Sequence, residues 1–421
     1  MALPVETTAA VPSDPDRARS ELVRFSAMLG PALMAANVAS YLLAVLGGRE
    51  LTTADYGFFG SLLSVLLVAS VPALAVQAVV ARRTAVGEMD RGQALRVGAI
   101  VGAGSAVIGL VITPALAIFL HAGSHAPGLV VIMLSLVPLN VLAGVQGRLQ
   151  GRERFARLSV LVILIGAGRL LGGVVPLALG AGSTVVMVGI AIGATVAALV
   201  GVRMLRDEPV GERAHPVAGR SAVRAEIVGA VLAMGALLLL SNLDLLLGRH
   251  VLSGTVSGRY AAGNVVAKIA FWLPQAVALA VMPRLSRGVD RRKALREALL
   301  LTAALAGAIV VVAAVAGVLV TRIAFGPRYA SIGSVAWLFA VQGGVLAMLQ
   351  LLILDDIATR RRVVAPLALL AAAVEVVVVL STGISTPHAL IATATLVAAG
   401  LGVAVAIRRG LGRRTLETSA P

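Results

Sequence analysis

Long apolar runs separated by short polar segments make up almost the whole chain. Each run approaches the length, about 20 residues, that an α-helix needs to cross the hydrocarbon core of a bilayer. The pattern predicts an all-α polytopic membrane protein with about 12 transmembrane helices. The expected spans are 25–46, 57–80, 97–120, 128–146, 158–179, 184–202, 225–247, 260–281, 297–320, 331–354, 365–382 and 388–407.

The basic residues between the runs lie mostly on one side of the membrane. Of the 36 Lys and Arg residues, 29 fall in the two terminal segments and in alternate loops, and only 5 fall in the loops of the opposite side. Cytoplasmic loops carry the excess of Lys and Arg in membrane proteins. We therefore expect both termini to be cytoplasmic and Arg49, Arg249 and Arg328 to lie outside.

The two halves of the chain repeat one plan. Residues 90–96 match residues 290–296 at five of seven positions, and upstream Tyr56 answers Tyr260 and Asn37 answers Asn242. Coincidence in an apolar composition is the alternative, but the matches occur in the same order. Six spans per half give both halves the same direction, which predicts a parallel repeat. The expected parts are listed in order: a disordered cytoplasmic tail 1–24, a six-helix lobe 25–202, a cytoplasmic linker 203–224, a second six-helix lobe 225–407 and a cytoplasmic tail 408–421.

Two prolines take equivalent interior positions in this repeat, Pro72 in the second span and Pro274 in the eighth. Proline removes a helical hydrogen bond and kinks a helix. We expect paired kinks that serve as gates, with a packing role as the alternative.

Composition excludes several classes of function. The chain is 59% hydrophobic and 13% charged, and it contains no cysteine, so disulfides and thiolate chemistry are absent. The net charge of +16 belongs to loops, which argues against a nucleic-acid-binding domain. No loop on the outer side is long enough to hold an active site, and no P-loop or HExxH motif occurs. We expect a protein that is not an enzyme and that uses no cofactor or metal.

Four charged residues fall inside predicted spans: Arg169, Asp244, Lys268 and Glu375. A charge at the centre of a membrane helix costs roughly 2.5–3.5 kcal/mol on insertion scales, so such residues mark functional sites or structural pairs. Structural pairing would join Asp244 to Lys268 and Arg169 to Glu375. The other interpretation places these residues around a cavity.

The eighth span carries a polar stripe as well as a charge. Asn264, Lys268, Phe271 and Gln275 are spaced by 4, 3 and 4 residues, which places them on one face of a helix. Such a face must look toward protein or water within the bilayer. Helix packing through hydrogen bonds and a cavity wall are both consistent with it.

The run from Asn37 to Ser64, with Arg49 followed by the pair Tyr56-Gly57, resembles the opening of bacterial polysaccharide-biosynthesis flippases (Wzx-like). These belong to the multidrug/oligosaccharidyl-lipid/polysaccharide (MOP) flippase superfamily. The second half is similar to it too, with Ser241-Asn242-Leu243-Asp244 followed by Gly258-Arg259-Tyr260.

The resemblance implies a MATE-like MOP fold of two six-helix lobes in the bacterial cytoplasmic membrane. It implies a protein that moves polyprenyl-pyrophosphate-linked oligosaccharide across this membrane by alternating access. Membrane lipids and the lipid-linked sugar would be its partners, with a glycan polymerase or glycosyltransferases as candidates and no nucleic acid. On this interpretation the residues of the substrate cavity are Arg169, Lys268, Arg49, Asn264, Gln275, Asn37 and Asn242. Asp244 and Glu375 would serve in ion coupling or charge pairing.

Other functions stay open. A cation-coupled multidrug or small-molecule antiporter of the same superfamily shares the twelve-helix plan, but such proteins usually carry an intramembrane Asp in the first lobe, and the first six spans contain none. An enzyme of glycan assembly would need acidic or histidine-rich outer loops. A scaffold would tolerate neutral residues at all four buried charges.

Overall fold

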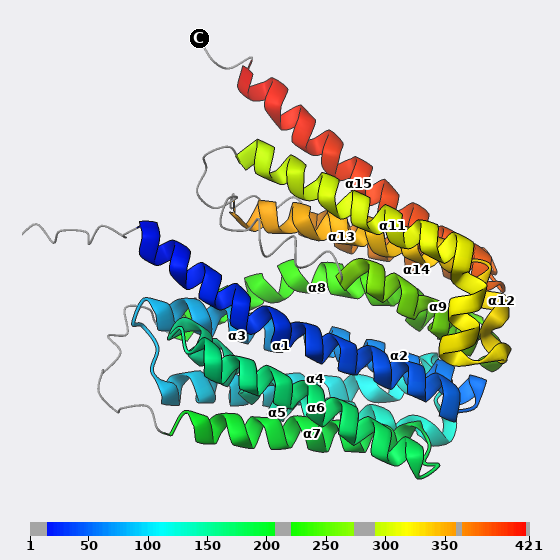
Figure 1. The fold of residues 1–421 in the computed structure, drawn as a ribbon, viewed down its shortest axis with the longest axis horizontal. Coiled ribbons are helices and arrows are strands. Elements are labelled where there is room, and N and C mark those ends of the chain that lie inside the picture. Colours follow the sequence, from blue (N-terminus) through cyan, green and yellow to red (C-terminus); the bar gives the residue numbers. More distant parts are fainter. Residues whose placement is uncertain (1–14, 207–219, 273–290, 359–363, 418–421) are drawn as a thin grey trace, which may run out of the picture.

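The structure is a computed structural model that describes residues 15–206, 220–272, 291–358 and 364–417. Within these ranges every regular element is helical, as the apolar runs predict (Figure 1). The helices of the first half are listed in order: α1 (Pro15–Glu50), α2 (Thr53–Ala69), α3 (Val71–Ala85), α4 (Arg91–Phe119), η1 (Gly123–His125), α5 (Ala126–Gly151), α6 (Phe155–Ala178) and α7 (Ser183–Met204).

The second half repeats this series of long helices. They are listed in order: α8 (Arg220–Val251), α9 (Gly254–Trp272), α11 (Arg291–Phe325), η2 (Pro327–Tyr329), α12 (Ala330–Gly333), α13 (Ala336–Ala358), α14 (Val364–Ser381) and α15 (Pro387–Glu417). Among the described residues, 11 helical stretches are long and apolar enough to cross a membrane. The predicted eighth span corresponds to α9, which runs to the end of a described range.

Several boundaries differ from the expected spans. Helix α1 begins at Pro15, so residues 15–24 of the predicted disordered tail are helical. The predicted second span consists of α2 and α3, which meet at Ser70, and Pro72 lies in the first turn of α3. Proline fits there because the first turn of a helix needs no partner for that N–H group. Pro274 lies outside the described residues.

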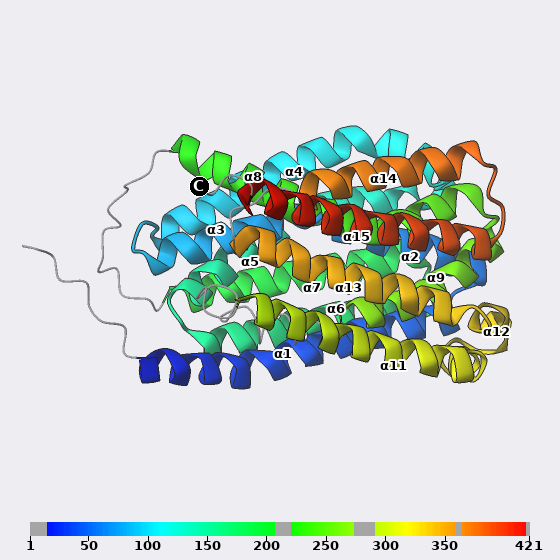
Figure 2. The ribbon, with the colours of Figure 1, turned by 90° about the horizontal axis from the view of Figure 1, so that it is seen from above.

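The helices run along one long axis and form an elongated bundle (Figures 1 and 2). Helices α1, α4, α8 and α11 all terminate at the same end, which we call the Arg49 end. The opposite end, where α3 terminates, we call the Arg82 end. Large apolar side chains such as Ile118 (78% exposed) and Val315 (85% exposed) cover the outside of the bundle. They suit contact with lipid tails.

Helices of the first half pack mainly on each other, as do those of the second half, and the halves meet where α2 and α3 contact α8 and α9. Glycine permits the closest of these crossings. A Cβ atom on Gly258 of α9 would lie 1.7 Å from the carbonyl oxygen of Thr53, and one on Gly57 of α2 would lie 2.7 Å from the Gly258 nitrogen. The two halves are thus in backbone contact near the Arg49 end.

Candidate functional site

A cavity of about 300 Å³ lies between the two halves, beside the crossing of α2 and α9. Its wall comes from α1, α2, α6, α8 and α9, so both halves contribute. The lining residues are Asn37, Ser40, Tyr41, Leu43, Ala44, Tyr56, Phe59, Gly60, Leu63, Ser64, Leu66, Leu67, Arg169, Leu245, Ala261, Asn264, Val265, Lys268 and Trp272.

Two cations stand in this wall, one from each half. Arg169 of α6 donates a hydrogen bond to the Ser40 hydroxyl of α1 (3.2 Å). The Lys268 ammonium donates to the Asn242 side-chain oxygen, and its contact with the Ser241 carbonyl oxygen is 3.4 Å. The hydrogen bonds of both cations go to neutral groups, and Asp244 behind the wall is a carboxylate that acts on the Lys268 charge.

Two carboxylates lie behind the cavity in the second half. Asp244 and Glu375 are 0% and 1% exposed. One oxygen of Asp244 accepts hydrogen bonds from the Tyr260 hydroxyl (2.8 Å) and the Asn264 amide (3.0 Å). Asp244 interacts electrostatically with Glu375 and Lys268. Asn264 therefore links the buried carboxylates to the cavity wall.

The structure brings together four of the predicted cavity residues, Arg169, Lys268, Asn264 and Asn37, on the cavity wall. Asn242 lies behind the wall as the partner of Lys268. Of the polar stripe, Phe271 is buried outside the wall and Gln275 lies outside the described residues.

The expected pairing of buried charges has a different geometry. Within the described part of the chain no ion pair joins Arg169 to Glu375 or Lys268 to Asp244 at 4.0 Å or less. The buried charged residues interact within their own half: Arg169 donates a hydrogen bond to Ser40 in the first half, and Glu375 interacts electrostatically with Asp244 in the second half.

Arg49 does not line the cavity and instead joins the two halves beyond it. Its guanidinium donates to the carbonyl oxygens of Ala324 (2.7 Å) and Ile323 at the end of α11. Arg328 of the second half makes the reciprocal contact: it donates to the carbonyl oxygens of Gly48 (2.7 Å) and Leu51 (2.9 Å) at the end of α1. The free carbonyls of a helix C-terminus attract cations, so each arginine caps a helix of the other half.

Aromatic rings fill the space between these arginines and the cavity. The Tyr56 ring lies 6.0 Å from Phe325 and 5.7 Å from Tyr329, centre to centre. Burial raises the pKa of Tyr329 above its usual value, so its hydroxyl stays neutral. The cavity is thereby closed at the Arg49 end.

A related contact joins α8 of the second half to the end of α4 in the first half. Arg249, at the end of α8, donates to the Leu120 carbonyl oxygen just after α4 (3.1 Å), and the His250 ring bonds the Phe119 carbonyl oxygen (2.8 Å). Arg49 and Arg249 are 200 residues apart, and their acceptors Leu120 and Ala324 are 204 apart. These offsets match the sequence repeat. We call these contacts the arginine latch: Arg49 and Arg328 join α1 to α11, and Arg249 joins α8 to α4.

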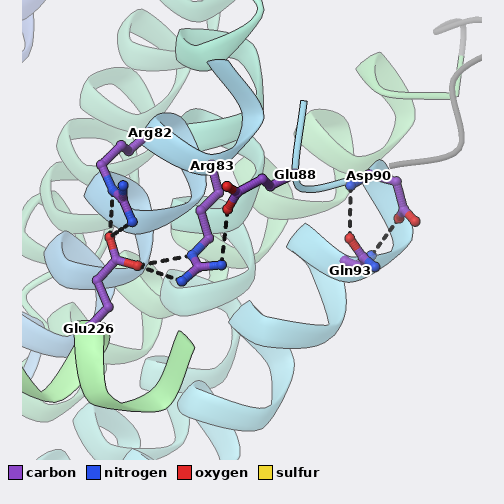
Figure 3. Close-up of polar contacts among 6 residues, drawn as sticks. All are labelled: Arg82, Arg83, Glu88, Asp90, Gln93 and Glu226. Carbon is purple, nitrogen blue, oxygen red and sulfur yellow. Dashed lines mark hydrogen bonds and ion pairs between the residues drawn. The ribbon is translucent and has the colours of Figure 1, made fainter. Parts of the chain in front are cut away.

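The two halves also meet at the Arg82 end (Figure 3). Arg82 and Arg83 of α3 both pair with Glu226 of α8, at 2.5 Å and 2.9 Å, and Arg83 also contacts Glu88 at 3.3 Å. Arg83 is only 5% exposed, whereas the side chains of Arg82 and Glu226 are 60% and 25% exposed, so water reaches part of this cluster. Nearby, Asp90 and Gln93 form a capping box that starts α4 (Figure 3).

Sequence reasoning placed Arg49 in the substrate cavity and did not predict the latch. Arg249 and Arg328 were counted only as loop charges. The signal was available in the equivalent positions of Arg49 and Arg249 at the ends of the first and seventh spans.

Solved structures with the same arrangement of helices are membrane transporters. A lipid II flippase, MurJ, in an inward closed conformation matches with a TM-score of 0.71 at 10% identity, covering 92% of this chain and 87% of that one. An inward-facing multidrug resistance MATE family transporter of the MOP superfamily matches with a TM-score of 0.64 at 14% identity, covering 92% and 96%. A MOP superfamily transporter from Pyrococcus furiosus matches with a TM-score of 0.57 at 14% identity, covering 93% and 95%. No family model and no curated protein sequence matches the chain.

These likenesses define the fold. The chain is a multi-pass, all-helical membrane protein with the fold of the MOP superfamily transporters. The expected fold class is confirmed. At 10–14% identity the likeness extends to the fold and not to a substrate.

Proposed function

We propose that this protein is a flippase that moves a polyprenyl-pyrophosphate-linked oligosaccharide, or a related polysaccharide precursor, across the bacterial cytoplasmic membrane. The observation that carries this proposal is the charge of the cavity. Arg169 and Lys268 line it, and no Asp or Glu stands among its described lining residues. A wall with fixed cations favours an anionic head group.

The two cations suit different parts of one anion. A guanidinium binds phosphate oxygens through two parallel hydrogen bonds, whereas an ammonium acts as a point charge. Arg169 comes from the first half and Lys268 from the second, so a diphosphate between them would contact both halves. Movement of the halves would then change the side of the membrane to which the anion is exposed.

The membrane potential supplies a driving force in this mechanism. An inside-negative potential favours outward movement of an anion by roughly 2.3 kcal/mol per charge per 100 mV. Asp244 and Glu375 suggest a second source of driving force. Two buried carboxylates are unfavourable unless a bound proton or another cation balances their charge. Asn264 connects this pair to the cavity wall. Proton binding there would be coupled to the substrate site.

The orientation of the proposal follows the distribution of basic residues, with the Arg49 end outside and both termini cytoplasmic. The arginine latch then closes the outer side. Membrane lipids surround the protein, and a glycan polymerase or glycosyltransferases remain candidate partners.

A cation-coupled multidrug or small-molecule antiporter is the second candidate. It is favoured by the two buried carboxylates Asp244 and Glu375, which interact electrostatically, since buried carboxylates favour a bound proton or another cation. In this case the substrate would be cationic, and Arg169 and Lys268 would oppose its binding. The sign of the cavity charge therefore separates the two candidates.

Transport by variants in reconstituted vesicles tests the flippase. We expect Arg169→Ala and Lys268→Ala each to abolish translocation of a lipid diphosphate oligosaccharide while the protein still inserts and accumulates. Lys268→Arg should retain part of the activity because it keeps the charge. Arg96→Ala, an exposed arginine outside the cavity, is the matched control. Translocation at the wild-type rate by either alanine variant would show that the residue is structural and that this mechanism is wrong.

A further inference from the structure

Aromatic side chains are scarce in this chain and concentrate around the cavity. The sequence has 2 Trp, 4 Tyr and 8 Phe residues among 421. Four of them, Tyr41, Tyr56, Phe59 and Trp272, line the cavity. Tyr56 and Phe59 are 2% and 0% exposed and fill the closed side. Tyr41 and Trp272 are half-buried and so present part of their surface to the cavity.

Tyr41 and Trp272 stand on helices of different halves and are held in place. The Tyr41 hydroxyl donates to the Lys268 carbonyl oxygen (3.3 Å), which joins α1 to α9. The Trp272 ring meets the buried Phe271 ring edge to face at 4.9 Å. Rigid aromatic rings lose little conformational entropy when they bind a ligand.

These two rings adjoin the cations of the proposed diphosphate site. Lys268 and Trp272 are four residues apart and therefore share one face of α9. Tyr41 directly follows Ser40, whose hydroxyl binds Arg169. A group attached to a diphosphate held by Arg169 and Lys268 would therefore reach the two aromatic residues.

The chemistry of these residues matches a sugar ring. A pyranose has an apolar face of C–H groups, which packs on an aromatic ring, and an edge of hydroxyl groups, which needs hydrogen bonds. An aromatic ring with a polar handle offers both kinds of contact. The amides of Asn37 and Asn264 and the hydroxyl of Ser64 stand in the same wall and can bond the hydroxyl edge.

We propose that Tyr41 and Trp272 form a saccharide subsite that binds the first sugar of the substrate, next to the diphosphate site of Arg169 and Lys268. This inference rests on the proposed function and makes it more specific. A bare lipid diphosphate would use only the cations, whereas a glycosylated one would also use the rings. The subsite thus selects lipids that already carry a sugar.

Tryptophan fluorescence tests the subsite directly, because Trp272 and Trp337 are the only two tryptophans. Trp337 lies on α13, is 40% exposed and is not part of the cavity. A Trp337→Phe protein therefore reports from Trp272 alone. We expect a short-chain polyprenyl diphosphate with one hexose to change its emission on binding. The same lipid diphosphate without the sugar should leave the emission nearly unchanged.

Binding of the two radiolabelled lipids to variants completes the test. Trp272→Leu and Tyr41→Leu should each weaken binding of the glycosylated lipid about tenfold and leave the bare lipid unaffected, since stacking on one aromatic ring contributes roughly 1–3 kcal/mol in nucleic-acid systems. Tyr41→Phe and Trp272→Phe keep a ring and should bind nearly as the wild type does. Unchanged binding of the bare lipid by the leucine variants would show that these variants are folded.

The outcomes separate this inference from the proposed function. Equal affinity of the wild type for both lipids, or an equal loss for both lipids in the leucine variants, would overturn the saccharide subsite and leave the flippase standing. Binding of neither lipid by the wild type would contradict the proposed function itself, and the subsite with it.

Discussion

Asp244 shows how single residues organise the interior of the second half. Its carboxylate is fully buried and accepts two hydrogen bonds from neighbouring helical positions, one of which, Asn264, reaches the cavity. A buried carboxylate without such donors would be strongly unfavourable in a bilayer. The polar groups here therefore depend on each other, and replacing one leaves the others without partners.

This dependence predicts the stability of variants. Asp244→Ala leaves the Tyr260 hydroxyl and the Asn264 amide without their acceptor, so we expect a loss of about 2–4 kcal/mol in the free energy of unfolding. Tyr260→Phe alone should cost about 1 kcal/mol, and adding it to Asp244→Ala should cost almost nothing more. Thermal unfolding of purified protein in detergent measures these differences. Additive losses in the double variant would show that the two side chains do not interact.

At the scale of elements, α6 and α7 pack through glycines rather than through large side chains. A Cβ atom on Gly189 would lie 1.8 Å from the Gly172 carbonyl oxygen, and one on Gly193 would lie 2.3 Å from that of Gly168. Small residues spaced by four allow membrane helices to approach closely and gain packing contacts. This contact fixes α6, and thereby the position of Arg169.

Substitution at this contact should therefore lower both stability and activity. We expect Gly189→Ala to destabilise the protein by about 1–3 kcal/mol, because the new methyl group forces the backbones apart. Gly104→Ala is the matched control, since a Cβ atom on Gly104 has nothing within 4 Å. Melting temperatures of the two variants in the same detergent give the comparison. Equal melting temperatures would mean that α6 and α7 separate without cost.

On the scale of the whole molecule, the arginine latch holds the Arg49 end closed, and the cavity lies between the two halves on the inner side of the latch. Arg49 and Arg328 join α1 to α11, and Arg249 joins α8 to α4. Opening this end requires the guanidinium groups to leave the helix C-termini. In the flippase mechanism that we propose, alternating access through this end would therefore depend on the strength of these contacts.

Removal of the latch arginines should shift the molecule toward opening at this end. Because the chain lacks cysteine, a single Phe59→Cys substitution below the latch reports access. We expect Arg49→Ala and Arg249→Ala each to raise its reaction with a membrane-impermeant thiol reagent about tenfold, since a hydrogen bond to a charged group contributes about 1.5 kcal/mol or more. Arg322→Ala, an exposed arginine at the same end, should leave the rate unchanged. If the latch variants react no faster than this control, the hydrogen bonds do not keep the end closed.

The same lack of cysteine makes the orientation in the membrane testable. We expect single cysteines at His121 and Ser385 to react with an impermeant reagent added to intact cells, and a cysteine at Arg152 to react only after the cells are opened. The physical reason is the bias of Lys and Arg toward one side. Labelling of the cysteine at Arg152 in intact cells would reverse the proposed orientation.

The long apolar runs were enough to predict most helices and the fold class, because the structures that can span a bilayer are limited mainly to helices of about one length. It did not place the break at Ser70, where the Ser70 hydroxyl donates to the Leu67 carbonyl oxygen, or the helical start at Pro15, because hydropathy marks apolar runs and not the ends of helices. The buried charges Arg169, Lys268 and Asp244 were visible in the sequence because charges are costly within hydrocarbon.

Only the tertiary structure decided what these charges contact. It placed Arg169 and Lys268 on one cavity, and it placed Glu375 near Asp244 rather than near Arg169. It also turned Arg49 away from the cavity and onto the end of α11. The reason is that periodicity fixes which face of a helix a residue occupies, whereas the partner of that face depends on how distant helices pack. That packing is decided by shape, through contacts such as Gly57 on Gly258, which a hydropathy pattern does not encode.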